Sequence, residues 1–161
     1  MQPPPIHLAA IDDEPPGDIP YTFTWGASLL SGFVCVLCVS LLIVSAQLDP
    51  EPSGVGTHNQ LGMAPCGFLQ STRLPCATCG MTTSFALAAD GRLLDAFITQ
   101  PAGALLALIT AIAALLSGYA SFKGLSLFPL IGTFWRPMTV VVFAVVVIGS
   151  WIYKIIILHG I

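Results

Sequence analysis

Charged side chains are scarce in this chain of 161 residues, of which only 8% are Asp, Glu, Lys or Arg. Soluble domains usually carry charges on about a quarter of their residues, so the composition excludes an ordinary soluble domain. The five Lys and Arg residues form no basic run, which argues against nucleic acid as a partner. The sequence also lacks a phosphate-binding glycine loop, a nucleophile elbow and an H-E-x-x-H motif, the usual signatures of nucleotide-binding and hydrolytic enzymes.

Hydrophobic residues make up 55% of the chain and gather in three long runs. The runs cover about residues 25–46, 101–122 and 138–158, each close to the roughly 20 residues that a helix needs to cross a bilayer. Lys154 is the only charged residue within them, and we expect its stem to snorkel towards the lipid headgroups. The pattern predicts an all-α membrane protein with three transmembrane helices and the lipid bilayer as its surroundings.

The remaining sequence divides into a tail and a loop. Residues 1–24 contain six prolines and four acidic residues, a composition that predicts a disordered tail. Residues 25–161 are predicted to form a single membrane domain, in which residues 47–100 are a loop between the first two spans. Within this loop, residues 80–89 and 92–98 have the composition of short helices that lie at the bilayer interface.

Three of the five cysteines lie in the loop, at Cys66, Cys76 and Cys79. Cys76 and Cys79 form a C-x-x-C motif directly before a predicted helix, whose N-terminus favours a thiolate. The other two, Cys35 and Cys38, lie inside the first apolar run, where we interpret them as small hydrophobic residues.

Three interpretations of the loop cysteines remain open. A structural disulfide would join Cys66 to Cys76 or Cys79 and shape the loop. A zinc site would use all three thiolates, with His58 as the fourth ligand. In thiol–disulfide exchange, Cys76 would be the attacking thiol, Cys79 its partner and Cys66 the resolving thiol.

Four segments of the loop form a wider pattern: L-G-M-A-P-C-G-F at 61–68, P-C-A-T-C-G-M-T at 75–82, D-G-R at 90–92 and Q-P at 100–101. Together they resemble a family of small bacterial membrane proteins, catalogued as domain of unknown function 2752, over roughly residues 60–103. Ala77 stands where that family usually has proline. The resemblance implies a membrane location and the cysteine motif, but no established activity, substrate or cofactor.

We therefore expect an integral protein of the bacterial inner membrane, with the cysteine loop on the periplasmic or outer side. Paired thiols on that side would oxidise. The predicted role is that of a non-enzymatic accessory or interaction subunit, with other membrane proteins as partners and a loop stabilised by a disulfide or a metal. The alternatives are a membrane thiol-disulfide oxidoreductase that uses Cys76 and Cys79, and a zinc-binding membrane protein.

Overall fold

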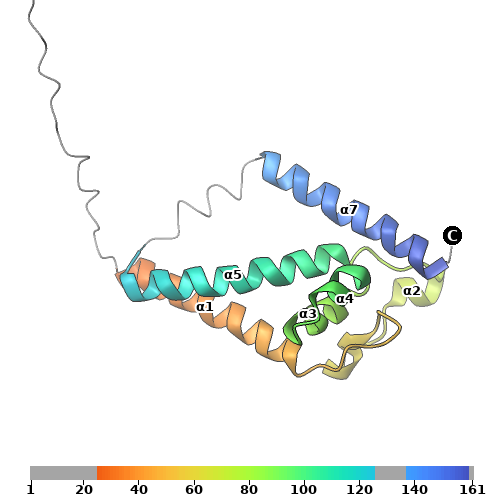
Figure 1. Cartoon of the computed structure of the whole chain (residues 1–161), viewed down its shortest axis with the longest axis horizontal. Helices are drawn as coiled ribbons and strands as arrows, with labels where there is room; N and C mark the ends of the chain where they lie inside the picture. The colour runs from red at the N-terminus through yellow and green to blue at the C-terminus, as the bar shows by residue number, and fades with distance from the viewer. Residues whose placement is uncertain (1–24, 126–136, 160–161) are drawn as a thin grey trace, which may run out of the picture.

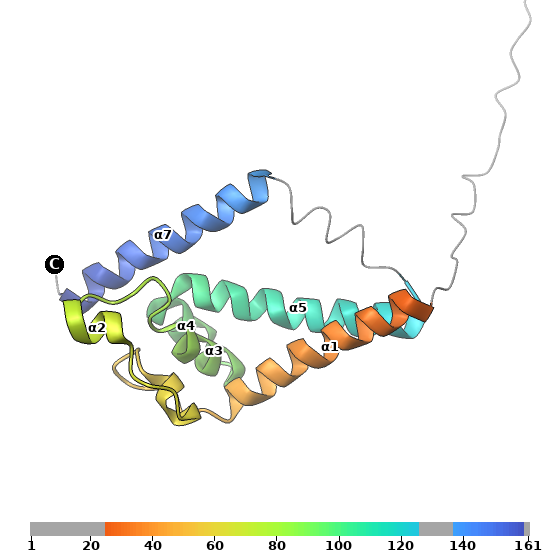
Figure 2. The same cartoon turned by 180° about the vertical axis from the view of Figure 1, so that it is seen from behind.

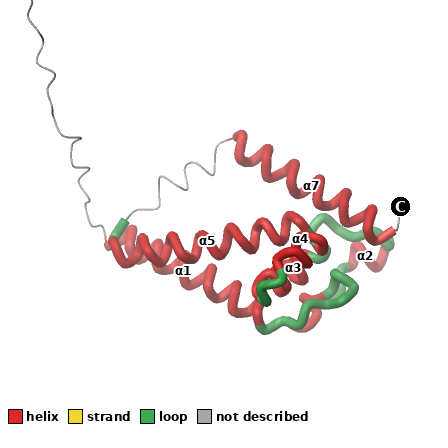
Figure 3. Tube along the Cα trace, in the orientation of Figure 1, coloured by secondary structure: helices red, strands yellow, loops and turns green. Residues whose placement is uncertain are grey.

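The computed structural model describes residues 25–125 and 137–159, and the predicted tail, residues 1–24, lies outside this part of the chain. All regular elements in the described residues are helices joined by loops (Figure 3). In chain order they are α1 (Trp25–Ala46), η1 (Thr57–Leu61), α2 (Gly67–Thr72), α3 (Met81–Ala89), α4 (Leu93–Thr99), α5 (Pro101–Lys123) and α7 (Pro137–His159).

The helices α1, α5 and α7 are long and apolar enough to cross a membrane. Their outward surfaces carry large apolar side chains, among them Leu29, Leu115 and Val145, which are 73%, 75% and 63% exposed. Such continuous apolar surface suits hydrocarbon rather than water. The prediction of an all-α protein with three membrane-spanning helices is confirmed, and the observed ends of the spans lie within a residue or so of the expected ones.

The α1 and α5 helices pack together where α1 begins and α5 ends, and they diverge towards their other ends, where α3 contacts both (Figure 1). At one end Ser28 Oγ donates a hydrogen bond to Ser121 O at 2.8 Å, and Ser121 Oγ donates to Ser28 O at 3.2 Å. Further along, a Cβ on Gly118 would lie 3.3 Å from Cys35 Sγ, so the absence of a side chain there lets the helices approach. The contact between the two helices is thus formed by small residues, as is common between membrane helices.

The short helices α3 and α4 fold back against α5 and the end of α1 (Figure 2). Ser84 on α3 is fully buried, and its hydroxyl lies 2.8 Å from Ala96 O and 3.1 Å from Gln100 O. A Cβ on Gly103 of α5 would lie only 3.0 Å from the Ser84 side chain, so α3 rests directly on the first turn of α5. Both short helices begin and end within one residue of the predicted ranges, whereas η1 and α2 were not predicted.

The α7 helix approaches the rest of the protein at its C-terminal end and diverges from α5 towards its N-terminal end (Figure 1). Near that C-terminal end, Trp151 Nε1 donates to Pro75 O at 2.8 Å. Lys154 Nζ donates to Gly54 O at 3.1 Å and to Thr99 O at 3.0 Å. The end of α7 is therefore fixed to the loop by side chains that bind loop carbonyls.

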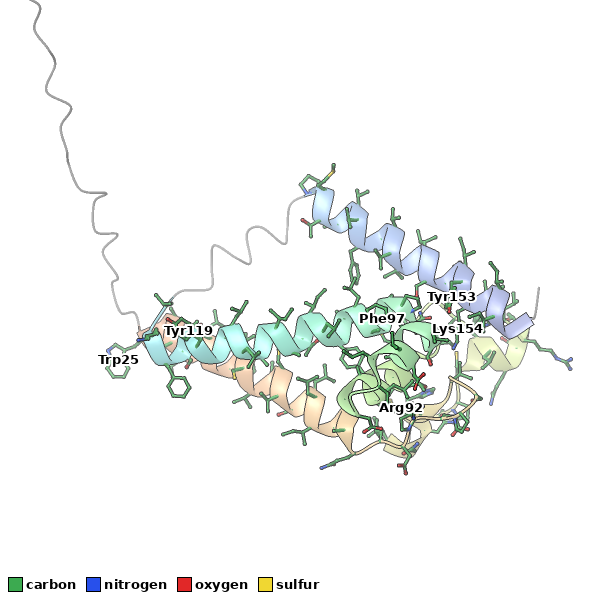
Figure 4. The ribbon with its side chains drawn as sticks, in the orientation of Figure 1. Trp25, Arg92, Phe97, Tyr119, Tyr153 and Lys154 are labelled. Atoms are coloured by element: carbon green, nitrogen blue, oxygen red, sulfur yellow. The ribbon has the colours of Figure 1, made fainter. Side chains whose placement is uncertain are left out.

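The expectation that Lys154 snorkels to the headgroups is wrong. Its side chain is only 3% exposed and points into the loop, beside the C-terminal end of α4 (Figure 4). The physical reason is that two loop carbonyls lie within reach, and an ammonium group bound by carbonyl oxygens needs no contact with headgroups. Tyr153, one residue earlier, donates its hydroxyl hydrogen to Ile98 O at 3.0 Å in the same region.

We expect Lys154→Met to destabilise the protein, because two partly buried carbonyls lose a donor while the length of the side chain is nearly kept. An unsatisfied buried acceptor costs about 1–3 kcal/mol, so the free energy of unfolding should fall by about that amount. Chemical unfolding in detergent measures the change. The matched control is Lys123→Met at the exposed end of α5, which should leave the unfolding free energy within about 0.5 kcal/mol of the wild type. Equal effects of the two substitutions would contradict a role for Lys154 in fixing the loop.

Candidate functional site

The three loop cysteines come together at one point. The Sγ atoms of Cys76 and Cys79 are 2.9 Å apart, and Cys79 Sγ lies 3.7 Å from Cys66 Sγ. All three sulfur atoms lie within 4.8 Å of one another. Cys66 comes from the residue before α2, and Cys76 and Cys79 come from the turn before α3. Two segments that are separate in the sequence thus build one group of three thiols, which we call the three-thiol cluster.

The turn that carries Cys76 and Cys79 requires glycine at its end. Gly80 has φ +88°, in the left-handed region that side chains disfavour. A Cβ at this position would also lie 2.6 Å from Gly54 O and 3.1 Å from Lys154 Nζ, so there is no space for one. The turn itself is closed by the Cys79 amide, which donates to Cys76 O at 3.0 Å. Gly80 therefore allows both the turn and its close approach to α7 and to the linker that follows α1, in which Gly54 lies.

Side chains from two spans hold this turn by its carbonyls. Trp151 of α7 binds the carbonyl of buried Pro75, directly before Cys76. Gln100, at the start of α5, donates from Nε2 to Ala77 O at 3.2 Å and is itself fully buried. The sequence pattern indicated no contact with this turn for either side chain. The one signal for Gln100 was its place in the Q-P pair of the family pattern.

The two cysteines of the C-x-x-C motif are electrostatically unequal. Burial alone would raise the pKa of Cys76, but hydrogen bonds from the Cys79 thiol and from Thr78 outweigh it and lower the pKa to about 7. Cys79 is only 7% exposed, and burial together with its hydrogen bond to Cys76 raises its pKa to about 12. The first thiolate of the pair therefore forms at Cys76 and is stabilised by the remaining proton on Cys79.

A cavity of about 560 Å³ opens beside the three-thiol cluster and is lined by all three cysteines. His58 lines the same cavity but lies outside the three-sulfur group, so its role as a fourth ligand stays a prediction. Its segment, η1, is attached to α3 by the buried hydrogen bond between the hydroxyl groups of Thr57 and Thr83, at 2.8 Å. Among the described residues, no Asp, Glu, Lys or Arg lines this cavity. Sulfur, one imidazole and neutral groups therefore dominate its chemistry.

The other pair of cysteines lies apart from the three-thiol cluster, in the middle of α1. Cys35 Sγ donates to Ala114 O of α5 at 3.4 Å, and Cys38 is partly exposed on the same helix. These contacts are those of small side chains at a helix–helix contact, as interpreted from the sequence.

In reduced, metal-free protein, we expect alkylation of Cys76 by iodoacetamide to rise about tenfold between pH 6 and pH 8, because the thiolate is the reactive form and its pKa is about 7. Cys79 should react far more slowly across this range, since burial and Cys76 raise its pKa. Mass mapping of alkylated peptides measures both rates. In Cys79→Ser the midpoint of the Cys76 alkylation profile should move away from pH 7, because the hydrogen bond from the Cys79 thiol that helps lower the Cys76 pKa is replaced. Faster alkylation of Cys79 than of Cys76 would contradict the assignment.

Comparison with known proteins gives one match, to a family model that covers the cysteine loop and part of α5. No curated protein and no solved structure matches the chain. Residues 66–114, which run from the first loop cysteine into the middle of α5, match the family described as protein of unknown function (DUF2752). The match confirms the resemblance seen in the sequence, and it covers the segment that builds the three-thiol cluster and its support on α5.

Proposed function

We propose that this chain is an accessory protein of the membrane whose loop is organised by a soft metal ion, such as zinc, bound by the thiolates of Cys66, Cys76 and Cys79. The observation that carries the proposal is the convergence of three sulfur atoms within 4.8 Å. A structural disulfide would use two of these thiols and leave the third beside it without a role. A metal ion uses all three, and thiolates are the preferred ligands of zinc and other soft ions.

The surroundings of the three-thiol cluster support metal binding. Metal coordination requires thiolates and releases their protons, and Cys76 supplies a thiolate near neutral pH because its pKa is lowered to about 7. Lys154 Nζ lies close enough to Gly80, the neighbour of Cys79, to place a cationic group next to the thiolates. The carbonyls on either side of Cys76 are already held by Trp151 and Gln100. The ligands are therefore positioned by the spans before the metal arrives.

An accessory role fits the distribution of polar chemistry in the described residues. The titratable side chains that line the cavity beside the three-thiol cluster are the three cysteines and His58. Arg92 and Asp95, the ion pair that the structure describes on the loop, are exposed on α4 and contribute little to stability or chemistry there. The loop therefore has the composition of a small metal-stabilised cap on a helical membrane anchor.

Metal analysis of the full chain in detergent, purified under reducing conditions, tests the proposal. We expect about one soft metal ion, zinc or copper, per chain by native mass spectrometry and elemental analysis, and loss of that ion from the purified Cys66→Ser, Cys76→Ser and Cys79→Ser variants. Cys38→Ser is the matched control, because this cysteine lies on α1 outside the cluster, and it should keep the wild-type metal content. Equal metal content in the loop variants and the control would contradict the proposal.

Thiol–disulfide exchange is the second candidate function, and the inequality of Cys76 and Cys79 favours it. The Cys76 thiolate would attack a disulfide of a partner, forming a mixed disulfide and releasing one partner thiolate. Cys79 would then attack Cys76, closing the Cys76–Cys79 disulfide and releasing the second partner thiol, so that two electrons pass to the partner. The 2.9 Å between the two sulfur atoms suits the second step, and Cys66 lies 3.7 Å from Cys79.

Trapping separates the two candidates. If the protein exchanges disulfides, Cys79→Ser should accumulate a mixed disulfide through Cys76, whereas Cys76→Ser should trap nothing. Non-reducing electrophoresis of cells quenched with acid, followed by mass spectrometry, detects such adducts. A protein that only binds metal should give no adduct in either variant, and both variants should instead lose the ion.

A further inference from the structure

The three-thiol cluster provides three metal ligands. Within the described residues, no histidine or carboxylate joins the group as a fourth ligand. Structural zinc is almost always bound by four ligands in a tetrahedron. Cu(I) is softer than zinc, is selected by thiolate and thioether sulfur, and is well satisfied by sulfur ligands alone. The number and type of ligands therefore favour Cu(I) at this position.

Two methionines extend the sulfur surface of the cavity. Met63 and Met81 line the same 560 Å³ cavity as Cys66, Cys76 and Cys79, and they are two of the four methionines in the chain. Methionine often fills gaps in apolar cores. Met63 does not have that role, because half of its surface is exposed. Its half-exposed side chain, on the wall of the cavity that the three cysteines also line, is instead open to a soft cation that enters this cavity.

The rest of the cavity does not favour a hard cation. Magnesium and calcium require several carboxylate or carbonyl oxygens in their coordination shell. None of the lining residues that the structure describes carries a carboxylate. Besides the imidazole of His58 and the amide of Asn59, the wall around the cysteines consists of apolar and hydroxyl side chains, so sulfur is the most abundant soft ligand that the cavity presents.

We propose that the ion bound by the three-thiol cluster is Cu(I), and that the thioethers of Met63 and Met81 form part of its binding site from the cavity side. This inference rests on the proposed function, because it names the ion and two additional ligands of the same site. It assigns to the methionines a role that distinguishes Cu(I) from zinc, since thioethers bind Cu(I) well and zinc poorly.

Competition titrations with the full chain in detergent, under reducing and oxygen-free conditions, test the inference. Cu(I) is titrated against the chromogenic chelator bicinchoninate, and Zn(II) against a zinc-responsive dye. Leucine replaces methionine with little change in volume, so Met63→Leu/Met81→Leu removes both sulfur atoms while largely keeping the packing. The matched control is Met138→Leu, at the start of α7, where the side chain is 75% exposed and does not line the cavity.

We expect the double variant to bind Cu(I) about 10–100-fold more weakly than the wild type, the usual range when a supporting group of a metal site is lost. Zinc affinity should stay unchanged, and Met138→Leu should match the wild type for both ions. Unchanged Cu(I) affinity in the double variant, or an equal loss for both ions, would overturn the role of the methionines and leave the three-thiolate site intact. A Cys66→Ser/Cys76→Ser/Cys79→Ser variant should bind both ions more weakly than the wild type. If it binds both as tightly as the wild type does, the proposed function itself is overturned.

Discussion

The carbonyl groups of an irregular loop beside membrane-spanning helices need hydrogen-bond donors. The whole structure depends on which side chains supply these donors. Backbone groups left without partners near hydrocarbon cost several kcal/mol each. In this protein the spans provide the donors: Lys154 for Gly54 and Thr99, Trp151 for Pro75. The loop can therefore lie against the helices without forming long helices of its own.

The same hydrogen bonds determine where the cysteines lie. The carbonyls before and after Cys76 are bound by Trp151 of α7 and by Gln100, the residue directly before α5, so the turn that presents this thiol is fixed at the ends of two spans. Gly80 then lets this turn pass within contact of the linker and of Lys154. Lys154 thus reaches from α7 to the loop beside the three-thiol cluster. Side-chain hydrogen bonds therefore join the site to the C-terminal end of α7.

The sequence predicted the spans well because their length and apolarity need no tertiary information. The ranges of α3 and α4 were also accessible, since each has enough residues for a helical pattern and a glycine or polar residue at its boundary. The helices η1 and α2 were not predicted, because five and six residues give too little periodicity and their ends depend on glycine and arginine in left-handed conformations. The role of Lys154 was missed for another reason: the sequence does not show which carbonyls lie at the depth of its side chain.

The cysteines of the site could be predicted from the sequence, but the side chains that hold their turn in place could not. Spacing and residue type were enough to single out Cys66, Cys76 and Cys79, and the structure brings their sulfur atoms together. The fully buried Gln100 has no apolar pattern to mark it, and its Oε1 has no hydrogen-bond partner among the described residues. Such positions are specified by the fold around them, so only the assembled structure reveals that they hold the turn.

X-ray absorption spectroscopy of the zinc-loaded full chain tests three-thiolate binding most directly, because it counts the sulfur atoms around the ion. Binding by Cys66, Cys76 and Cys79 predicts three sulfur neighbours at about 2.3 Å in the wild type, and two in Cys66→Ser when excess zinc is added to fill the weakened site. A shell made only of nitrogen and oxygen, or a sulfur count that the Cys66→Ser substitution leaves unchanged, would contradict it.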